Sequence, residues 1–408
     1  MRRLKDYIIP ALYNIRHNPS FALFYVLGTA LSFVFITITL QLLYSFVGNV
    51  PPLDKGDRII SITDYRDTKG YSLGGIYANY TDAFVEGIRG HEMYARVNIE
   101  QGHVFAGEAM ASQVVNFVNA DYWEVFQFEF LEGRAFSQQE YEEKQPVAVI
   151  NRNVAESLYK QGRAVGQKIE FQGTTYTITG VVENVSFFTT LIADGVWVSD
   201  RFNTFIPSGH NYYEMFVLFP SDYPMTEAKG EVARAIKIYY EGRGREADIS
   251  VEKVSTRQED IIRSIGIGIL SYGIPVIVFL LLLVPAINIL TLSVANSNRQ
   301  SEEIAIRRAI GASRFVLFSF IVVENFLLVL VGVVIGLLLV FPTIHLVEYL
   351  CFEDSFWENM SFLTRLDFVV IVGGVLPLSI LFTLLTSVLP ARLALQRNMA
   401  EVLKGGSK

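Results

Sequence analysis

Four long apolar segments constrain this chain more than any other feature of its sequence. They are Phe21–Phe46, Ile267–Val294, Phe315–Phe341 and Phe368–Leu389. A helix needs about 20 mostly apolar residues to cross a bilayer, and each segment meets that length. The third segment alone contains a charged residue, Glu324. Together with a hydrophobic content of 51%, the segments predict a membrane protein with four transmembrane α-helices.

Basic residues in the short connections indicate how the spans are oriented, because Lys and Arg concentrate on the cytosolic side. The connection 342–367 contains one basic residue, Arg365, whereas the flanks on the other side are rich in them. Both termini are therefore expected in the cytosol. The basic flanking residues are Arg2, Arg3, Lys5 and Arg16 before the first span; Arg299, Arg307, Arg308 and Arg314 before the third; and Arg392, Arg397, Lys404 and Lys408 after the fourth.

The long segment between the first two spans is expected to form an α+β domain outside the membrane. Val147–Ile150 is typical of a buried strand, residues 167–184 of a hairpin with its turn at Gln172-Gly173, and residues 225–241 of an amphipathic helix. Strands and helices are mixed without the regular alternation of a doubly wound sheet.

Residues 256–294 are predicted to form one helix that includes both a stalk and the second span. A capping box begins it, either Ser255 with Gln258 or Thr256 with Glu259. Such a helix would be roughly 58 Å long at about 1.5 Å per residue, twice the bilayer core. The alternative is a loop before an ordinary span.

The complete expected order of segments follows from these patterns. It is an amphipathic cytosolic lead helix at 1–20, a first span at 21–47, an outer domain at 48–255, a stalk plus second span at 256–294, a cytosolic helix at 295–313, a third span at 315–341, a short outer loop at 342–367, a fourth span at 368–389 and a cytosolic tail at 390–408.

Several classes of protein are excluded by motifs that the sequence lacks. It contains no G-x-x-x-x-G-K-[ST] phosphate loop, no G-x-S-x-G elbow and no H-E-x-x-H pair, and its five histidines have no ligand spacing. A net charge of −7 argues against a nucleic-acid partner. The single cysteine, Cys351, excludes a disulfide framework. No catalytic residue, metal or cofactor is therefore expected in this chain, and it is not expected to be an enzyme.

The stretch Ser301–Phe315 is the best candidate for a functional site. Glu303 and Arg307 are spaced as a helical ion pair, Gly311 is a typical helix terminator and Ser313 can cap the following helix. Ile306 and Ile310 share one apolar side. The pattern fits a short helix parallel to the membrane, which either docks a partner or simply lies at the interface.

Glu324, Gly332 and Gly336 are candidates for packing between membrane helices. A carboxylate inside a span is costly, so Glu324 is expected to face a neighbouring helix as a lock or gate, or else to reach the interface or be protonated. The two glycines form a small-xxx-small face that permits close helix contact, and such a face can also serve as a dimer seam.

The sequence resembles the MacB/FtsX-type permeases of ABC transporters along nearly its whole length. The segment "EEIAIRRAIGASRFVLFSFIVVENFLLVLVGVVIG" is similar to the family signature, and residues 118–184 are similar to the extracytoplasmic core domain. The tail "LPARLALQRNMAEVLKG" resembles the family ending, with Met399 in place of proline and Lys404 in place of arginine.

The resemblance implies that the helix at about Glu302–Ala312 is a coupling helix seated in a separate ABC ATPase, which binds ATP and Mg²⁺. The implied contact residues are Glu303, Ile304, Arg307, Arg308, Ala309, Gly311, Ala312 and Ser313.

It further implies a bacterial inner-membrane protein that works by mechanotransmission, paired with a second copy or a related permease in the lipid bilayer. A periplasmic adaptor and an outer-membrane channel are possible further partners. The client is expected to be an exported drug, peptide or lipoprotein. The alternatives are an FtsX-like regulator of a cell-wall hydrolase, with no transported substrate, and a membrane-anchored sensor.

Overall fold

The computed structural model places most of the chain in two compact units. One unit comprises 1–44, 268–347 and 365–408, and the other 45–267 and 348–364. We call them the membrane unit and the outer unit and describe each by itself. The structure describes residues 9, 12–13, 15–48, 50–62, 69, 75–159, 163–185, 195–203, 212–246, 249–266, 268–283, 285–287, 306–308, 310–352, 361 and 363–396.

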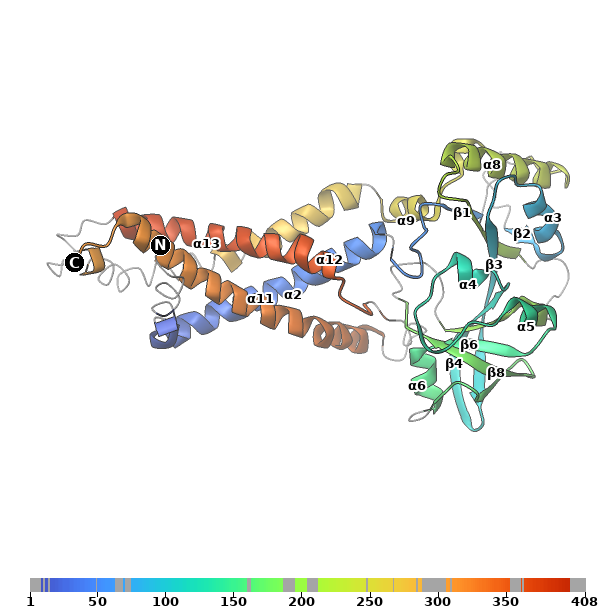
Figure 1. Ribbon diagram of the computed structural model, residues 1–408, viewed down its shortest axis with the longest axis horizontal. Coiled ribbons are helices and arrows are strands. Elements are labelled where there is room, and N and C mark those ends of the chain that lie inside the picture. The colour runs from blue at the N-terminus through green and yellow to red at the C-terminus, as the bar shows by residue number, and fades with distance from the viewer. Residues whose placement is uncertain are drawn as a thin grey trace. The chain divides into compact units, whose positions relative to one another are not determined.

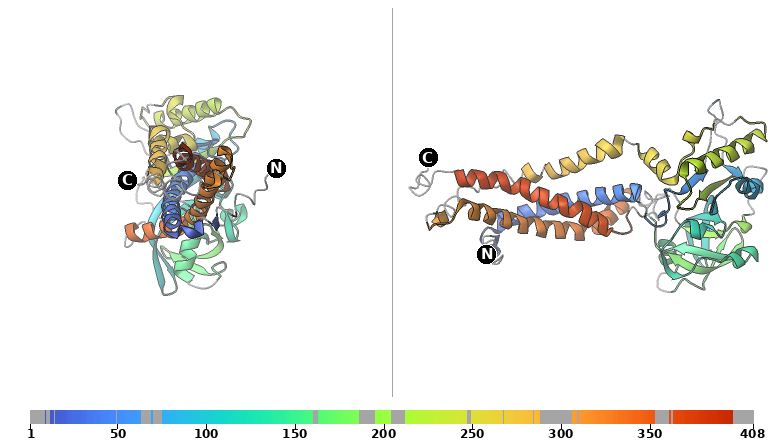
Figure 2. Two further views of the ribbon diagram at one scale, coloured as in Figure 1. Left: turned by 90° about the vertical axis from the view of Figure 1, so that its left-hand side faces the viewer. Right: turned by 45° about the horizontal axis from the view of Figure 1, so that its top comes forward.

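The membrane unit is a bundle of long apolar helices. They are α2 (Pro19–Val47), an apolar helix at Ser271–Ile287, α11 (Arg314–Phe352), and a last helix made of α12 (Phe368–Val370), a π-helical turn (Ile371–Val375) and α13 (Leu376–Gln396). Figures 1 and 2 show α2, α11 and α13 running side by side. All four helices contribute to one buried cluster, which includes Tyr25, Phe33, Leu282, Leu328 and Phe382.

Three of the described helices are long and apolar enough to cross a membrane: Pro19–Val47, Arg314–Leu350 and Phe368–Val388. They correspond to the first, third and fourth predicted spans. Of the second, 267–294, the structure describes a shorter helix, Ser271–Ile287, and residues 288–294 lie outside the described part. The predicted four-span count is therefore supported for three spans.

The third span was predicted too short. Helix α11 passes through Pro342 and ends at Phe352, so the beginning of the predicted outer loop, 342–367, is helical. Proline removes one backbone hydrogen bond, yet membrane helices tolerate it where the neighbouring sequence remains apolar. The last helix likewise continues to Gln396, beyond the predicted boundary at Leu389.

The predicted stalk helix is interrupted. Helix α9 (Arg257–Ile265) begins with the capping box of Thr256 and Glu259, one of the two predicted alternatives. It ends because Gly266 adopts a φ of +86°, a left-handed conformation open to glycine that stops an α-helix. One helix over 256–294 is therefore wrong. Before Pro19, the described residues 9, 12–13 and 15–17 are helical, as expected for the lead segment.

The outer unit is built on a mixed sheet of ten strands (Figure 1). The main path runs β1-β10-β3-β4-β9-β6-β8-β5, while β2 pairs with β10 and β7 pairs with β3 and β8. The pairs β4–β9 and β6–β8 are parallel and the others antiparallel, which confirms the α+β class for this unit. The strands are β1 (Ile59–Ile62), β2 (Ile76–Tyr77), β3 (Met93–Ala106), β4 (Ala109–Val118), β5 (Phe130–Gly133), β6 (Val147–Asn151), β7 (Lys168–Phe171), β8 (Thr174–Val182), β9 (Val196–Ser199) and β10 (Tyr212–Leu218).

The helices of the outer unit bury apolar faces against this sheet. The predicted helix 225–241 is α8 (Met225–Glu241), whose Val232 and Ile236 pack on β1 and β10. The predicted hairpin is β7–β8, with Gln172 and Gly173 at positive φ in its turn. The remaining helices are α3 (Thr81–Glu86), α4 (Tyr122–Val125), α5 (Gln138–Glu142) and α6 (Arg152–Tyr159).

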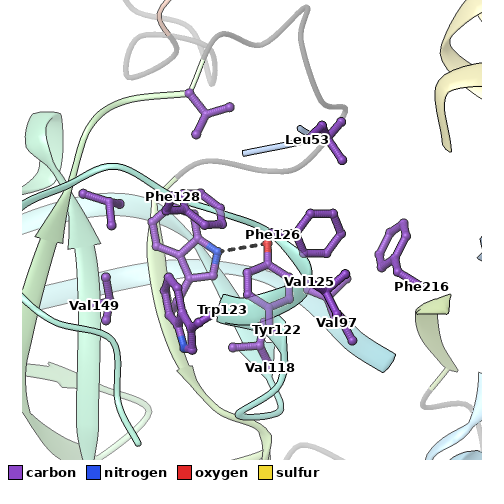
Figure 3. Close-up of a cluster of buried hydrophobic side chains, with 14 of the residues drawn as sticks. Leu53, Val97, Val118, Tyr122, Trp123, Val125, Phe126, Phe128, Val149 and Phe216 are labelled. Atoms are coloured by element: carbon purple, nitrogen blue, oxygen red, sulfur yellow. Dashed lines mark hydrogen bonds between the residues drawn. The ribbon is translucent and has the colours of Figure 1, made fainter. Parts of the chain in front are cut away.

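An aromatic cluster around α4 forms a second core of the outer unit (Figure 3). Trp123 lies edge-on to Phe136 and close to Trp197, with ring centroids 5.6 and 6.1 Å away. The indole N–H of Trp197 donates to the Tyr122 hydroxyl at 3.4 Å. Each such aromatic pair adds about 0.5–1.5 kcal/mol beyond its buried area.

Candidate functional site

The segment preceding α11 ends in a tight capped turn. Residues 306–308 are helical, and Gly311 has a φ of +101°. The amide of Ala312 donates to the carbonyl of Arg307, and that of Gly311 to Arg308, both at 3.0 Å. This hydrogen-bond pattern is a Schellman motif, in which glycine supplies the left-handed residue. The predicted role of Gly311 as helix terminator is confirmed.

Ser313 starts the next helix, as predicted. Its hydroxyl accepts a hydrogen bond from the amide of Val316 at 3.4 Å, and its carbonyl accepts one from Leu317 at 3.2 Å. The chain therefore reverses within Gly311–Ser313 and continues directly into α11. We call Ile306–Ser313 the coupling turn. Its position is fixed by backbone hydrogen bonds at both sides of the reversal.

The coupling turn presents apolar side chains outward. Ile310 is 83% exposed, Ile306 52%, and Phe315, at the start of α11, 76%. This exposure fits both alternatives raised by the sequence, a surface that docks a partner and a helix that lies at the membrane interface. Neither isoleucine belongs to the contact set that the family resemblance implied, although their spacing places them on one apolar side.

The Arg307 side chain packs back onto α11. Its guanidinium carbon lies 4.3 Å from the centre of the Phe320 ring, a cation–π contact that fixes the turn against the helix that follows it. Arg308 is half-buried. Glu303, Ile304 and Ala309 lie outside the described residues, so the predicted Glu303–Arg307 pair stays a prediction, as does ATPase contact for the whole set.

Glu324 is buried between membrane helices, with 7% of its surface exposed. Tyr25 on α2 is also fully buried. Its hydroxyl is hydrogen-bonded to Thr386 Oγ1 of α13 at 2.9 Å. A side chain that reached the interface would be exposed, so burial disfavours that alternative, while a helix–helix lock or gate and a protonated side chain both stay predictions.

Gly332 and Gly336 pack against α2 of the same chain. A Cβ at Gly332 would lie 2.7 Å from Thr29 Cβ, and one at Gly336 would lie 2.9 Å from the carbonyl oxygen of Ala30. From Gly332 to Gly336 on α11, the contact on α2 moves forward from Thr29 to Ala30, so the two helices run parallel. The predicted close-packing face is present, and α2 rather than a second copy occupies it.

A buried ion network in the outer unit was not anticipated from the sequence. Arg96 on β3 donates to Asp200 Oδ2 from Nε at 2.5 Å and to the Tyr141 hydroxyl from Nη2 at 3.0 Å. Tyr141 in turn donates to Asp200 Oδ1 at 2.8 Å, and burial raises the pKa of Tyr141 to about 12. The signal for this network in the sequence was Arg96, which lies at a buried position of β3.

The described residues contain no group of three His, Cys, Asp or Glu side chains able to hold a metal ion. The polar clusters present are interhelical contacts in the membrane unit and structural ion pairs in the outer unit.

Comparison with known proteins gives two matches along the chain. Residues 22–235 match the MacB-like periplasmic core domain, and residues 275–399 the FtsX-like permease C-terminal region. YknZ of Bacillus subtilis, an uncharacterized ABC transporter permease, is 22% identical over 337 residues, 80% of this chain and 79% of that protein. The macrolide export ATP-binding/permease protein MacB of Acinetobacter baylyi is 22% identical over 242 residues, 57% of this chain and 34% of that protein.

Two solved structures are also similar. The periplasmic region of MacB from Actinobacillus actinomycetemcomitans aligns over 52% of this chain and 93% of its own, with 12% identity and a TM-score of 0.42. The extracellular domain of YknZ from Gram-positive bacteria aligns over 46% of this chain and 98% of its own, with 15% identity and a TM-score of 0.38.

Proposed function

Because the chain belongs to the MacB/FtsX-type family of ABC transporter permeases, we propose that it converts ATP hydrolysis by a separate ATPase subunit into movement of its outer unit. The absence of a phosphate loop from the sequence supports an ATPase on another chain. In this proposal the protein is a multi-pass component of the bacterial cytoplasmic membrane with both termini in the cytosol.

The coupling turn is the observation that carries the proposal. It lies in the sequence between the second and third predicted spans, exposes Ile306 and Ile310, and contains the left-handed Gly311. The two exposed isoleucines, which we call the apolar knob, are flanked by Arg308 and would fit a groove on the ATPase surface. Buried apolar anchors commonly provide most of the energy of such interfaces.

The interior of the membrane unit supports mechanical transmission. The polar side chains of Tyr25, Glu324 and Thr386 are buried within the helix bundle, whereas an aqueous path would need polar groups facing water. The client is then handled by the outer unit, and we propose export of a drug, peptide or lipoprotein. Control of a cell-wall hydrolase is the second candidate, which partner identification separates from export.

Co-purification of the full-length protein in mild detergent, followed by mass spectrometry, tests this proposal. The wild-type protein is expected to bring down an ABC ATPase. Ile310→Asp places a charge on the exposed knob and should reduce the recovered ATPase at least about tenfold, which corresponds to about 1.4 kcal/mol. Arg307→Glu combined with Arg308→Glu should act in the same direction.

The matched control is Ile238→Asp on α8 of the outer unit, where the isoleucine is also exposed. It should leave ATPase recovery unchanged. If Ile310→Asp and Ile238→Asp retain equal amounts of ATPase, the coupling turn is not the docking site. A cell-wall hydrolase among the recovered proteins, without an adaptor or channel, would replace export by hydrolase control.

A further inference from the structure

Helix α2 is hydrogen-bonded to the last membrane helix at both of its ends. Near the start of α2, the hydroxyls of Tyr25 and Thr386 are 2.9 Å apart, and both residues are buried. Near its end, Gln41 Nε2 donates to Asp367 Oδ2 at 2.7 Å. The Asp367 amide donates back to Gln41 Oε1 at 2.9 Å, so the Gln41 side chain makes two bonds.

Two apolar contacts lie between these hydrogen bonds. The rings of Phe33 and Phe382 meet edge to face, with centroids 5.9 Å apart and planes at 84°. A Cβ on Gly374 would lie 2.8 Å from a side-chain carbon of Leu40, so glycine lets the π-helical turn approach α2 closely. Turns of this type inside a helix often occur at functional sites.

The four contacts form an antiparallel ladder. The residue numbers on α2 increase from Tyr25 to Gln41 along these contacts, whereas those of their partners decrease from Thr386 to Asp367. Polar bonds at both ends and close packing between them prevent α2 from sliding along the last helix. Sliding by one residue would break all the contacts together.

We infer that α2 and the last helix (Phe368–Gln396) form one mechanical element, the clamped pair, which moves as a single body during the cycle. Its role in the cycle rests on the proposed function. Helix α2 continues past the membrane unit, where Phe46 packs against the outer core and Gln258 Nε2 donates to the Val47 carbonyl at 2.7 Å.

A double-mutant cycle on the full-length protein tests the clamp without any partner. Tyr25→Phe and Thr386→Val should each raise the unfolding equilibrium constant about threefold in an SDS titration followed by circular dichroism, the average for an interhelical hydrogen bond. The double variant should lose less than the sum of the two single variants, because both single variants lose the Tyr25–Thr386 bond, whereas the bonds of the Thr386 hydroxyl to its own helix are lost only with Thr386→Val. Thr39→Val is the control, since the Thr39 hydroxyl bonds only to Phe35 of its own helix. Independent, additive effects would overturn the clamp.

A reversible cross-link tests movement as one body. Leu40→Cys with Gly374→Cys, in a Cys351→Ala background, joins α2 to the last helix where they already touch. Oxidation of the two cysteines should leave stimulation of the co-purified ATPase at the same level as in the protein with reduced cysteines. Each single-cysteine variant is a control. Loss of stimulation on oxidation that returns on reduction would overturn the inference. If no ATPase co-purifies, the proposed function fails, while the double-mutant cycle still decides on the clamp.

Discussion

Replacing Arg96 by methionine should destabilise the outer unit more than any surface substitution. The Arg96 side chain is 10% exposed and that of its partner Asp200 only 2%. In the wild-type protein, the positive charge of the Arg96 guanidinium compensates the negative charge of the buried Asp200 carboxylate. Arg96→Met keeps most of the volume of the side chain and leaves Asp200 with the Tyr141 hydroxyl as its remaining donor among the contacts above.

The expected loss is about 3–5 kcal/mol, the usual effect of removing one member of a buried ion pair. For a unit of this size, 1 kcal/mol shifts the melting temperature by about 2–4 °C, so the loss corresponds to roughly 6–20 °C. The control is Lys237→Met, because Lys237 and Glu241 form an exposed pair at 3.7 Å. That pair should contribute at most about 0.5 kcal/mol.

Tryptophan fluorescence of the full-length protein in detergent reports the transition. Two of the three tryptophans, Trp123 and Trp197, belong to the aromatic core of the outer unit. Adding Asp200→Leu to Arg96→Met should recover part of the loss, because it removes the uncompensated carboxylate. The reasoning is refuted if Arg96→Met melts within about 2 °C of Lys237→Met, a shift below about 1 kcal/mol.

Three further predictions concern helix packing, pH and the extent of the outer unit. Gly332→Ala should lower the free energy of unfolding in an SDS titration by about 1–3 kcal/mol because its Cβ would overlap α2. Gly28→Ala, with open space around it, should not destabilise; equal losses would contradict close packing of Gly332 against α2. The pKa of Glu140 falls to about 2, chiefly through its hydrogen bond from the Arg134 guanidinium. The stabilisation by ionised Glu140 should therefore be present above about pH 4.5, the ordinary glutamate range, and disappear as the pH falls towards 2. The difference in melting temperature between wild type and Glu140→Gln should shrink over that interval; a constant difference would contradict this assignment. A soluble fragment from residue 45 to Gly266 should melt cooperatively and higher than one ending at Glu252, which lacks α9; equal melting temperatures would show that α9 contributes nothing.

Local signals in the sequence were sufficient wherever a few neighbouring residues determine the backbone. Gly311 and Ser313 end one helix and begin the next by contacts within six residues, and the Thr256 capping box acts within three. The hairpin turn at Gln172-Gly173 is of the same kind. Residue type and spacing alone predict the two turns, and they narrow the capping box to two alternatives, of which the structure has Thr256 with Glu259.

Features that depend on distant parts of the chain were missed. Arg96 and Asp200 are 104 residues apart, and Tyr25 and Thr386 are 361 apart, so no spacing rule links them. Gly266 was read as an ordinary helix residue because the flanking residues favour helix, and Pro342 as a boundary although the apolar pattern continues past it. At Gly266 the cause is local, because glycine readily adopts the left-handed conformation that ends the helix.

The interruption at Gly266 has a consequence for the kind of force each connection can carry. A continuous α-helix resists twisting because its successive hydrogen bonds couple every turn to the next. A left-handed glycine breaks that series, so rotation applied on one side of Gly266 is dissipated in two soft dihedral angles rather than passed on. Helix α2 has no such break between Pro19 and Val47. Within the described residues, α2 is thus an unbroken helix up to Val47, whereas a left-handed glycine ends α9.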